Sequence, residues 1–275
     1  MTAGGVPFLK GNATENDFIL LPNRDGALVV SAGQVVALCD RHAGIGADGV
    51  VVVSPTAETG FFMDYRNADG SFAEMCGNGA RLFARYLVDA GWEAPGTFSF
   101  ATRGGRRTAE LAATGDFGVG MGPATIGAES KAEVSGVSIT GTAVDVGNPH
   151  LVCWVESPAE LEALDLTKPP QFDSTAFPAG VNIEFVVPLA IDRIRMRVYE
   201  RGVGETRSCG TGTVAAAAAH LSGGERAGLT GGAVTVEIPG GVVQVSFAAG
   251  GGTLTGPAQM VASGVIDRDF WNRHR

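Results

Sequence analysis

Two cysteines, Cys76 and Cys209, lie in nearly the same pentapeptide, MCGNG at 75–79 and SCGTG at 208–212. A helix-like run follows each one at once. The first turn of a helix has N–H groups without intrahelical partners and carries about half a positive charge. A thiol at such a place has a lowered pKa, and the glycines let the backbone approach an anion closely. We therefore expect two reactive thiols, each beside a carboxylate-binding helix start.

One carboxylate held by both helix starts would place its α-carbon between two sulfur atoms on opposite faces. One thiolate can then remove the α-proton while the other thiol delivers a proton from the far side. Backbone N–H groups aimed at the carboxylate stabilise the carbanion-like state, each contributing about 3–4 kcal/mol in good geometry. This pattern predicts inversion of a stereocentre with no cofactor and no metal.

The similarity between the two segments extends beyond the pentapeptides. MDYRNADGSFAEMCGNGAR at 63–81 aligns without a gap on MRVYERGVGETRSCGTGTV at 196–214, and Asn67 and Glu200 each precede their cysteine by nine residues. Such internal repetition indicates two equivalent modules. A pseudo-twofold axis between them would bring the helix starts face to face. The alternative is a duplication in which the two cysteines lie far apart.

Strand patterns dominate the rest of the chain, and helical patterns are few. Short β-branched or alternating runs that end at Gly, Pro or Asp predict strands within 50–54, 61–66, 97–102, 106–114, 116–122, 150–156, 181–188, 192–200, 233–247 and 252–264. Helices are predicted within 31–41, 77–90, 157–166 and 210–222. Many strands with few helices favour an α+β or barrel-like fold over alternating βαβ units. A loose join is expected at 121–130.

Composition excludes several classes of protein. The chain has 275 residues, of which 45% are hydrophobic, so one large or two medium cores are expected. A net charge of −9 with no long basic run argues against nucleic acid or an anionic membrane as a partner. The N-terminal segment lacks the pattern of a signal peptide, and no apolar run is long enough to span a bilayer. The four cysteines show no CxxC spacing. We expect a cytoplasmic protein with reduced thiols.

Two other motifs were weighed against this chemistry. GIGADG at 44–49 matches the dinucleotide-binding pattern in letters, but it neither follows a strand pattern nor opens a helix pattern. A Cys/His hydrolase could use His150 with either cysteine, yet it gives no reason for a second cysteine in an equivalent frame. Cys39 and Cys153 are expected to be buried packing residues.

Six segments resemble the diaminopimelate epimerase family, and they occur in that family's order. They are NDF at 16–18, DRHAGIGADG at 40–49, RNADGSFAEMCGNGAR at 66–81, VGNPHLV at 146–152, VNIEF at 181–185 and VYERGVGETRSCGTG at 198–212. The resemblance implies interconversion of LL- and meso-2,6-diaminopimelate, a step of lysine and peptidoglycan precursor biosynthesis. The neighbouring alternative is a two-cysteine racemase or epimerase acting on proline or hydroxyproline.

The resemblance also implies a role for each matching residue. Cys76 and Cys209 would be the acid/base pair, with Cys209 the base for the LL isomer and Cys76 the donor. His150 and Glu200 would adjust the pKa values of the thiols. Glu200 would also hold a substrate ammonium group and Arg201 the distal carboxylate. The remaining substrate contacts would come from Asn16, Asn67, Gly77, Asn78, Asn148, Asn182, Gly210 and Thr211.

The family's fold implies two similar α+β modules, each a curved mixed sheet wrapped around a central helix. The expected modules are 1–121 with 264–275, and 122–263, because the last strand returns to the first module. A homodimer is also implied. Two positions depart from the family pattern: Glu15 stands where a glycine is usual before Asn16, and Gly49 stands where some members have a substrate-contacting glutamine.

Overall fold

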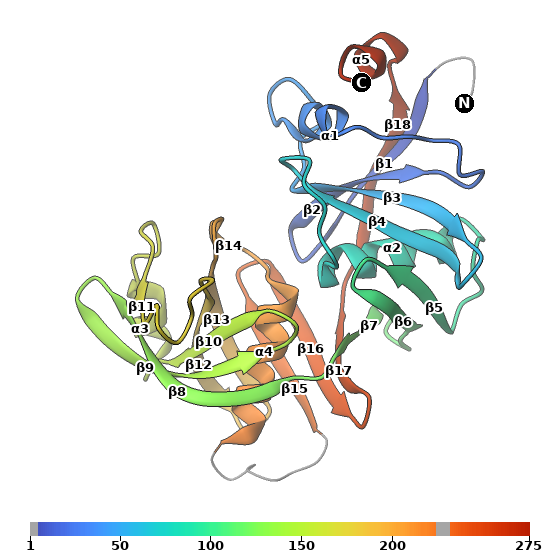
Figure 1. Cartoon of the computed structure of the whole chain (residues 1–275). Helices are drawn as coiled ribbons and strands as arrows, with labels where there is room; N and C mark the ends of the chain where they lie inside the picture. Colours follow the sequence, from blue (N-terminus) through green and yellow to red (C-terminus); the bar gives the residue numbers. More distant parts are fainter. Residues whose placement is uncertain (1–4, 224–231) are drawn as a thin grey trace. The chain divides into compact units, whose positions relative to one another are not determined.

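The computed structural model describes residues 5–223 and 232–275, and the chain divides into two compact units (Figure 1). Unit 1 comprises 1–119 and 256–275, and unit 2 comprises 120–255. Residues 1–4, where the sequence analysis found no signal-peptide pattern, and residues 224–231 lie outside the described residues. The module boundaries predicted at 121/122 and 263/264 differ from these limits, since the return to unit 1 comes at residue 256 rather than 264.

Unit 1 is one mixed sheet with a helix at its centre. Its strands are β1 (Val6–Ala13), β2 (Asn16–Pro22), β3 (Gly49–Thr56), β4 (Gly60–Asn67), β5 (Thr97–Thr102), β6 (Gly105–Leu111), β7 (Phe117–Gly122) and β18 (Gln259–Ile266). Its helices are α1 (Ala32–Cys39), α2 (Gly77–Asp89) and α5 (Arg268–Arg273). The strand order is β18-β1-β2-β3-β4-β5-β6-β7, with only the β2–β3 and β4–β5 pairs parallel.

Unit 2 repeats this plan. Its strands are β8 (Thr125–Val134), β9 (Val137–Asp145), β10 (Pro149–Trp154), β11 (Gln171–Phe172), β12 (Asn182–Ala190), β13 (Arg193–Glu200), β14 (Gly204–Thr206), β15 (Gly232–Ile238), β16 (Gly241–Ala248) and β17 (Gly251–Gly256). Its helices are α3 (Pro158–Ala163) and α4 (Gly210–Ser222). The order β8-β9-β10-β12-β13-β15-β16-β17 again has two parallel pairs, β10–β12 and β13–β15, at the places equivalent to those in unit 1.

Helices α2 and α4 hold equivalent places in the chain, each between the fifth and sixth strands of its sheet order. Most residues of both helices are buried, including Arg81 and Leu82 in α2 and Val214 in α4. Both helices contact most of the strands of their own sheet (Figure 1). The predicted α+β fold of two similar modules, each a mixed sheet around a central helix, is therefore confirmed.

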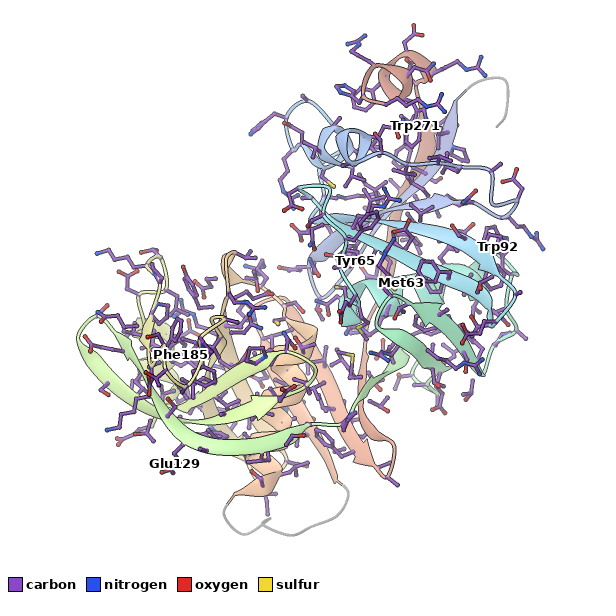
Figure 2. The ribbon with its side chains drawn as sticks, in the orientation of Figure 1. Met63, Tyr65, Trp92, Glu129, Phe185 and Trp271 are labelled. Carbon is purple, nitrogen blue, oxygen red and sulfur yellow. The ribbon has the colours of Figure 1, made fainter. Side chains whose placement is uncertain are left out.

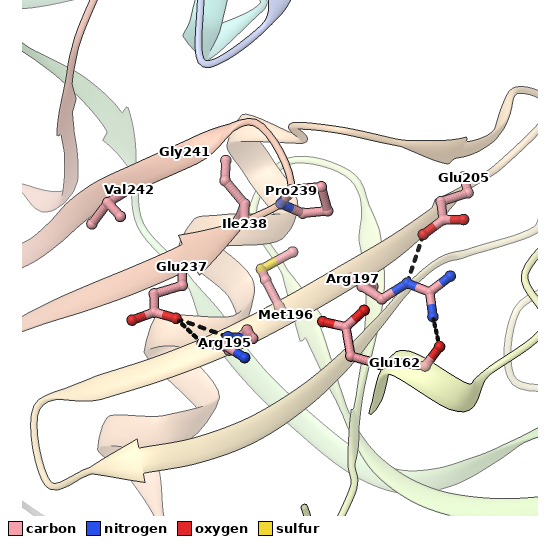
Figure 3. Close-up of a pocket in the computed structure, with 10 residues that line it drawn as sticks. All are labelled: Glu162, Arg195, Met196, Arg197, Glu205, Glu237, Ile238, Pro239, Gly241 and Val242. Carbon is pink, nitrogen blue, oxygen red and sulfur yellow. Dashed lines mark hydrogen bonds and ion pairs between the residues drawn. The ribbon is translucent and has the colours of Figure 1, made fainter. Parts of the chain in front are cut away.

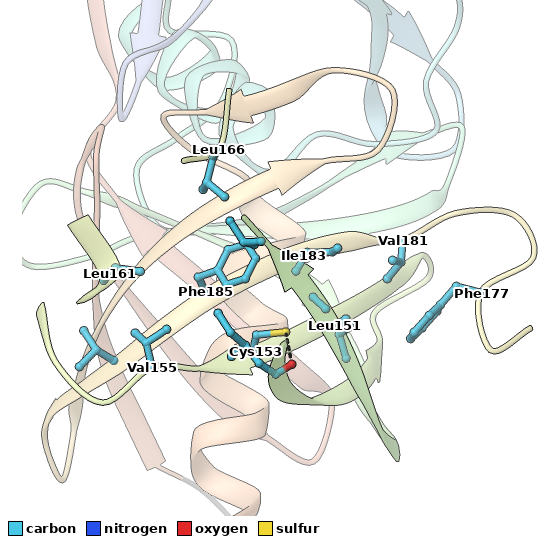
Figure 4. Close-up of a cluster of buried hydrophobic side chains, with 13 residues drawn as sticks. Leu151, Cys153, Val155, Leu161, Leu166, Phe177, Val181, Ile183 and Phe185 are labelled. Carbon is cyan, nitrogen blue, oxygen red and sulfur yellow. Dashed lines mark hydrogen bonds between the residues drawn. The ribbon is translucent and has the colours of Figure 1, made fainter. Parts of the chain in front are cut away.

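Part of the outer face of each sheet is also covered, which explains the continuous apolar runs in the strands concerned. In unit 1, Val35 and Leu38 of α1 and Trp271 of α5 join a cluster with Val50 and Val52 of β3; Figure 2 labels Trp271 on α5. In unit 2, α3 and the segment after it cover β10 and β12, where Leu151, Cys153, Ile183 and Phe185 are buried (Figure 4). Strands buried on both faces lose the polar alternation of a half-exposed strand.

The predicted strands and helices are present, with two differences. The segment 121–130 is not a loose join, because Thr125 begins the long strand β8. The sequence analysis also missed β1, β2 and β9, whose glycines or polar residues obscure the period-two pattern, and the short strands β11 and β14. Among the residues described, no helix is both long enough and apolar enough to cross a membrane.

Candidate active site

Cys76 caps the N-terminus of α2, as the sequence predicts. Its backbone is extended, with φ −137°, and its Sγ accepts a hydrogen bond from the Gly79 N–H at 3.4 Å. A cysteine sulfur thus takes the capping place that Ser, Thr, Asp or Asn usually fills. The side chain is half-buried, and the helix start directs its N–H groups and its positive end toward the same region.

Asn16 lies beside Cys76, at the start of β2. Its Oδ1 accepts from Asn78 Nδ2 at 3.1 Å and lies 3.9 Å from Cys76 Sγ, as an acceptor for the thiol. Its Nδ2 donates to Asp48 Oδ2 at 2.7 Å, and Asp48 is ion-paired with Arg41. The amide is therefore oriented from both ends. Of the residues predicted for this half of the site, the structure brings Asn16, Cys76 and Asn78 together.

The turn that precedes Asn16 has an unusual backbone. Thr14 and Glu15, the two residues between β1 and β2, have φ values of 50° and 61°. Two-residue hairpin turns of this kind favour Asn or Gly, because a side chain in the left-handed region is strained. Glu15, which stands where the family usually has glycine, therefore still forms the tight turn, but with a strained backbone.

Cys209 caps α4 in the same way, with φ −117° and a hydrogen bond from the Gly212 N–H to Sγ at 3.4 Å. Thr211 Oγ1 lies 3.6 Å from the same sulfur. The thiol itself is buried, with 6% exposed. The two cysteines thus occupy equivalent places with equal cap distances, one in each unit.

A chain of hydrogen bonds leads from Cys209 into the core of unit 2. Thr211 Oγ1 accepts from Asn148 Nδ2 at 3.5 Å, and Asn148 Oδ1 lies 3.1 Å from His150 Nε2. His150 Nδ1 lies 2.7 Å from Glu184 Oε1, and both of these side chains are fully buried. The predicted residues Asn148, His150, Cys209 and Thr211 are therefore connected, with Glu184 at the inner end.

The remaining predicted residues lie at the ends of strands. Glu200, at the end of β13, accepts a short hydrogen bond from Thr206 Oγ1. Asn182 Oδ1 accepts from the Arg201 backbone N–H at 2.9 Å, while the exposed Arg201 guanidinium donates to the Ala179 carbonyl at 2.7 Å. Asn67, at the end of β4, donates to Ser71 Oγ at 3.0 Å within its own turn.

The predicted lowering of the thiol pKa is wrong for Cys209 in this structure. Burial raises the pKa of the Cys209 thiol well above its usual value, and the nearby carboxyl groups of Glu200 and Glu184 raise it further. The hydrogen bonds from Gly212 and Thr211 act in the opposite direction but are outweighed. Burial also raises the pKa of Glu200, against a hydrogen bond from Thr206 that lowers it. The helix dipole alone does not decide the charge of this site.

Sequence reasoning missed Glu184. Its Oε1 contacts His150, and its Oε2 has no hydrogen-bond partner among the described residues. Glu184 also lies against Gly212, so close that a Cβ added to this glycine would be 2.5 Å from Oε1. The available signal was a lone carboxylate in the apolar run VNIEFVVP. A charged residue at a core position of a strand requires a buried partner.

A separate cavity of about 590 Å³ lies in unit 2, between β13, β15 and the start of β16 (Figure 3). Its arginines are already engaged: Arg195 pairs with Glu237 at 2.7 Å, and Arg197 pairs with Glu205 at 2.7 Å. None of the predicted site residues lines this cavity. Within the described part of the chain, no three His, Cys, Asp or Glu side chains are grouped so as to hold a metal ion.

Comparison with known proteins agrees with the two-unit geometry. The family model described as diaminopimelate epimerase matches the chain twice, at residues 8–127 and 142–261. The first match covers most of unit 1 and the second covers most of unit 2. A diaminopimelate epimerase of Rhodococcus jostii (strain RHA1) is 48% identical, covering 97% of this chain and 99% of its own. One of Corynebacterium glutamicum (strain ATCC 13032) is 47% identical, covering 95% and 98%. A solved hydroxyproline epimerase from Agrobacterium vitis is similar in fold alone, with a TM-score of 0.68, 14% identity, and 98% and 94% coverage.

Proposed function

This chain belongs to the diaminopimelate epimerase family, and from that membership we propose that it converts LL-2,6-diaminopimelate to meso-diaminopimelate by a two-thiol mechanism. It is an isomerase, and the name of its relatives indicates a place in lysine biosynthesis. The observation that carries the mechanism is the equivalence of Cys76 and Cys209. Both sulfurs cap a central helix at the same distance from the third N–H of that helix.

In the proposed reaction both thiols act on one α-carbon. For the LL isomer, the Cys209 thiolate takes the α-proton, and the electron pair of the broken C–H bond passes into the adjacent carboxylate. The Cys76 thiol then gives its proton to the opposite face of the carbon. The reverse reaction exchanges these roles, so each turnover moves the thiolate from one cysteine to the other.

The carboxylate that receives the electron pair is held by the two helix starts. The donors we propose are the backbone N–H groups of Gly77, Asn78, Gly210 and Thr211. First-turn N–H groups of a helix favour anions, and donors already in position need no reorganisation as charge develops. The buried surroundings of α2 and α4 strengthen these interactions, because the local dielectric is low.

Side chains near the cysteines recognise the rest of the substrate. We propose that Asn16, Asn67, Asn148 and Asn182 bind its polar groups, that Glu200 holds an ammonium group, and that the exposed Arg201 binds the distal carboxylate. Glu200 and His150 also influence the Cys209 thiol. His150 acts through Asn148 and Thr211, whereas Glu200 acts directly by its charge.

Similarity favours this substrate over proline or hydroxyproline. The diaminopimelate epimerases are 47–48% identical over nearly the whole chain, whereas the hydroxyproline epimerase shares only the fold at 14% identity. We further propose that the protein acts in the cytoplasm, where its thiols stay reduced, and that it forms a homodimer. Light scattering across a range of protein concentrations tests the homodimer.

The experiment that tests the mechanism is incubation of the pure protein with LL-diaminopimelate in deuterium oxide. The expected product is meso-diaminopimelate with one deuterium at the inverted carbon, while the remaining LL substrate stays unlabelled at early times. Cys76→Ala and Cys209→Ala should give no meso product, and Cys39→Ala, which removes a buried thiol from α1, serves as the matched control. Turnover by either catalytic variant at the wild-type rate would refute the two-thiol mechanism.

A further inference from the structure

Helix α2 contains a buried cation that the proposed mechanism does not use. Arg81 lies five residues after Cys76, about 7.5 Å further along the helix axis, and its side chain is 0% exposed. Its Nη2 donates to Thr14 Oγ1 at 3.0 Å. Nε and Nη1 have no hydrogen-bond partner among the described residues. Burial of a guanidinium lowers the stability of the fold unless a negatively charged group nearby balances its charge.

The carboxylates on the strands around α2 are engaged with other cations. Asp17 on β2 pairs with Lys10 and Arg41, and Asp64 on β4 pairs with Arg66 and Arg103. Burial lowers the pKa of Arg81 to about 10, so the group is still a cation at neutral pH. The groups whose negative charge would act against this lowering are Cys76, in its thiolate form, and then Asp116.

Helical geometry directs Arg81 toward the start of α2. Side chains on a helix lean toward its N-terminus, so a long side chain reaches back over the preceding turn. The contact with Thr14 confirms this direction, because Thr14 lies in the turn that leads into Asn16, the neighbour of Cys76. The same contact holds the strained Thr14–Glu15 turn in place.

The equivalent place in unit 2 has the opposite character. In the gap-free alignment of the two modules, Arg81 corresponds to Val214, which is fully buried in α4. Cys209 instead has the carboxyl groups of Glu184 and Glu200 nearby. The two thiols therefore share a backbone geometry, but Cys76 interacts with a buried cation whereas Cys209 interacts with buried carboxyl groups.

We propose that Arg81 is a positioning residue whose buried positive charge keeps Cys76 as the thiolate in the substrate-free protein, while Cys209 rests as the thiol. The resting protein is then in the form that accepts the meso isomer, because in the proposed mechanism Cys76 is the base for that isomer. Return to the form that accepts the LL isomer requires exchange of protons with water. Only the statement about which isomer the resting protein accepts rests on the proposed function, because the charge of each thiol can be measured without substrate.

The first measurement needs only the wild-type protein. Iodoacetamide is added over a range of pH without substrate, and mass spectrometry follows each cysteine-containing peptide. The cysteines are compared by the pH midpoint of alkylation rather than by its rate, because the rate also depends on how exposed each cysteine is. Cys76 should have the lower midpoint. Cys39 and Cys153 should remain unmodified, because burial raises their pKa values to about 11 and about 12. A Cys76 midpoint at or above that of Cys209 would overturn the proposal.

The second measurement removes the charge. Arg81→Met should raise the Cys76 midpoint by about one pH unit or more, because loss of a nearby cation disfavours the thiolate. The Cys209 midpoint should not move. Arg81→Lys should restore most of the wild-type value. Arg85→Met removes a cation from the exposed face of the same helix, where Arg85 pairs with Asp89, and should have no effect. An unchanged Cys76 midpoint, or equal shifts of both cysteines, would contradict the assignment.

Epimerisation kinetics separate this inference from the proposed function. In Arg81→Met the rising limb of the pH profile of kcat/KM should move to higher pH in both directions. The two directions must change by the same factor, since the equilibrium between the isomers is fixed. A wild-type protein without epimerase activity would refute the proposed function, whereas the alkylation midpoints would still decide the charge of Cys76. If Arg81→Met does not fold, the wild-type midpoints and Arg81→Lys decide it.

Discussion

Gly212→Ala tests whether the contacts beneath Cys209 are as close as the structure shows. Gly212 lies in the first turn of α4, where alanine would ordinarily stabilise the helix by about 1 kcal/mol. Here a Cβ would be 2.5 Å from Glu184 Oε1 and 3.2 Å from Cys209 Sγ. Glu184 would have to move, and its 2.7 Å contact with His150 would be broken in a fully buried place.

The expected magnitude follows from these opposing effects. Overpacking a core costs about 1–3 kcal/mol, and a buried hydrogen bond to a charged group contributes about 1.5–3 kcal/mol. After the gain in helix propensity, we expect Gly212→Ala to lower the free energy of unfolding by about 1.5–5 kcal/mol. For a chain of this size the melting temperature should fall by roughly 3–20 °C.

The repeat supplies a matched control. Gly79 is the equivalent residue of α2, and a Cβ there would meet the flexible end of Met63 at 3.0 Å and Cys76 Cβ at 3.6 Å. Gly79→Ala should therefore change the melting temperature by no more than about 2 °C. Differential scanning calorimetry of both variants, with the epimerisation assay, measures the contrast. A Gly212→Ala protein as stable and as active as Gly79→Ala would refute the close approach of Glu184.

Three further predictions concern charge and the reacting thiols. Cys76→Ala and Cys209→Ala should each lower the rate of epimerisation by at least about 10³-fold, measured by chiral separation of the isomers. Glu200→Gln should lower the pH midpoint of Cys209 alkylation, since it removes a carboxyl group that raises the thiol pKa; Glu205→Gln, which breaks a pair with Arg197, should leave that midpoint unchanged. The free energy of unfolding should fall as the pH drops below about 4. Burial would raise the pKa of Asp17, but hydrogen bonds from Arg41 and Lys10 outweigh burial and hold that pKa well below its usual value. Protonation of Asp17 at low pH therefore removes the stabilisation that these two cations give to the folded protein. Urea titrations of the wild type and of Asp17→Asn from pH 7 to pH 3 should show a smaller loss in the variant.

The fold was largely accessible from the sequence because its determinants are local. Apolar runs such as VVVV at 50–53 predict strands covered on both faces, and the repeated Cys-Gly-polar-Gly segments predict two equivalent helix starts. The strand β8 was mistaken for a loose join because Gly122 and Pro123 lie just before it and Gly127 interrupts its pattern. Pairing with β9 and β11 compensates for these residues, and that pairing is not visible in the segment itself.

The sequence alone determined which atoms can react and where they lie on their elements: a thiol at the start of each of two central helices. Only the tertiary structure decided the charge around each thiol. Glu184 reaches Cys209 from a strand that begins 27 residues before it, and Arg81 bonds to a turn 67 residues away along the chain. The pKa of a buried group depends on desolvation and on charges within a few ångströms, and such distances are set by packing between segments that are remote in sequence.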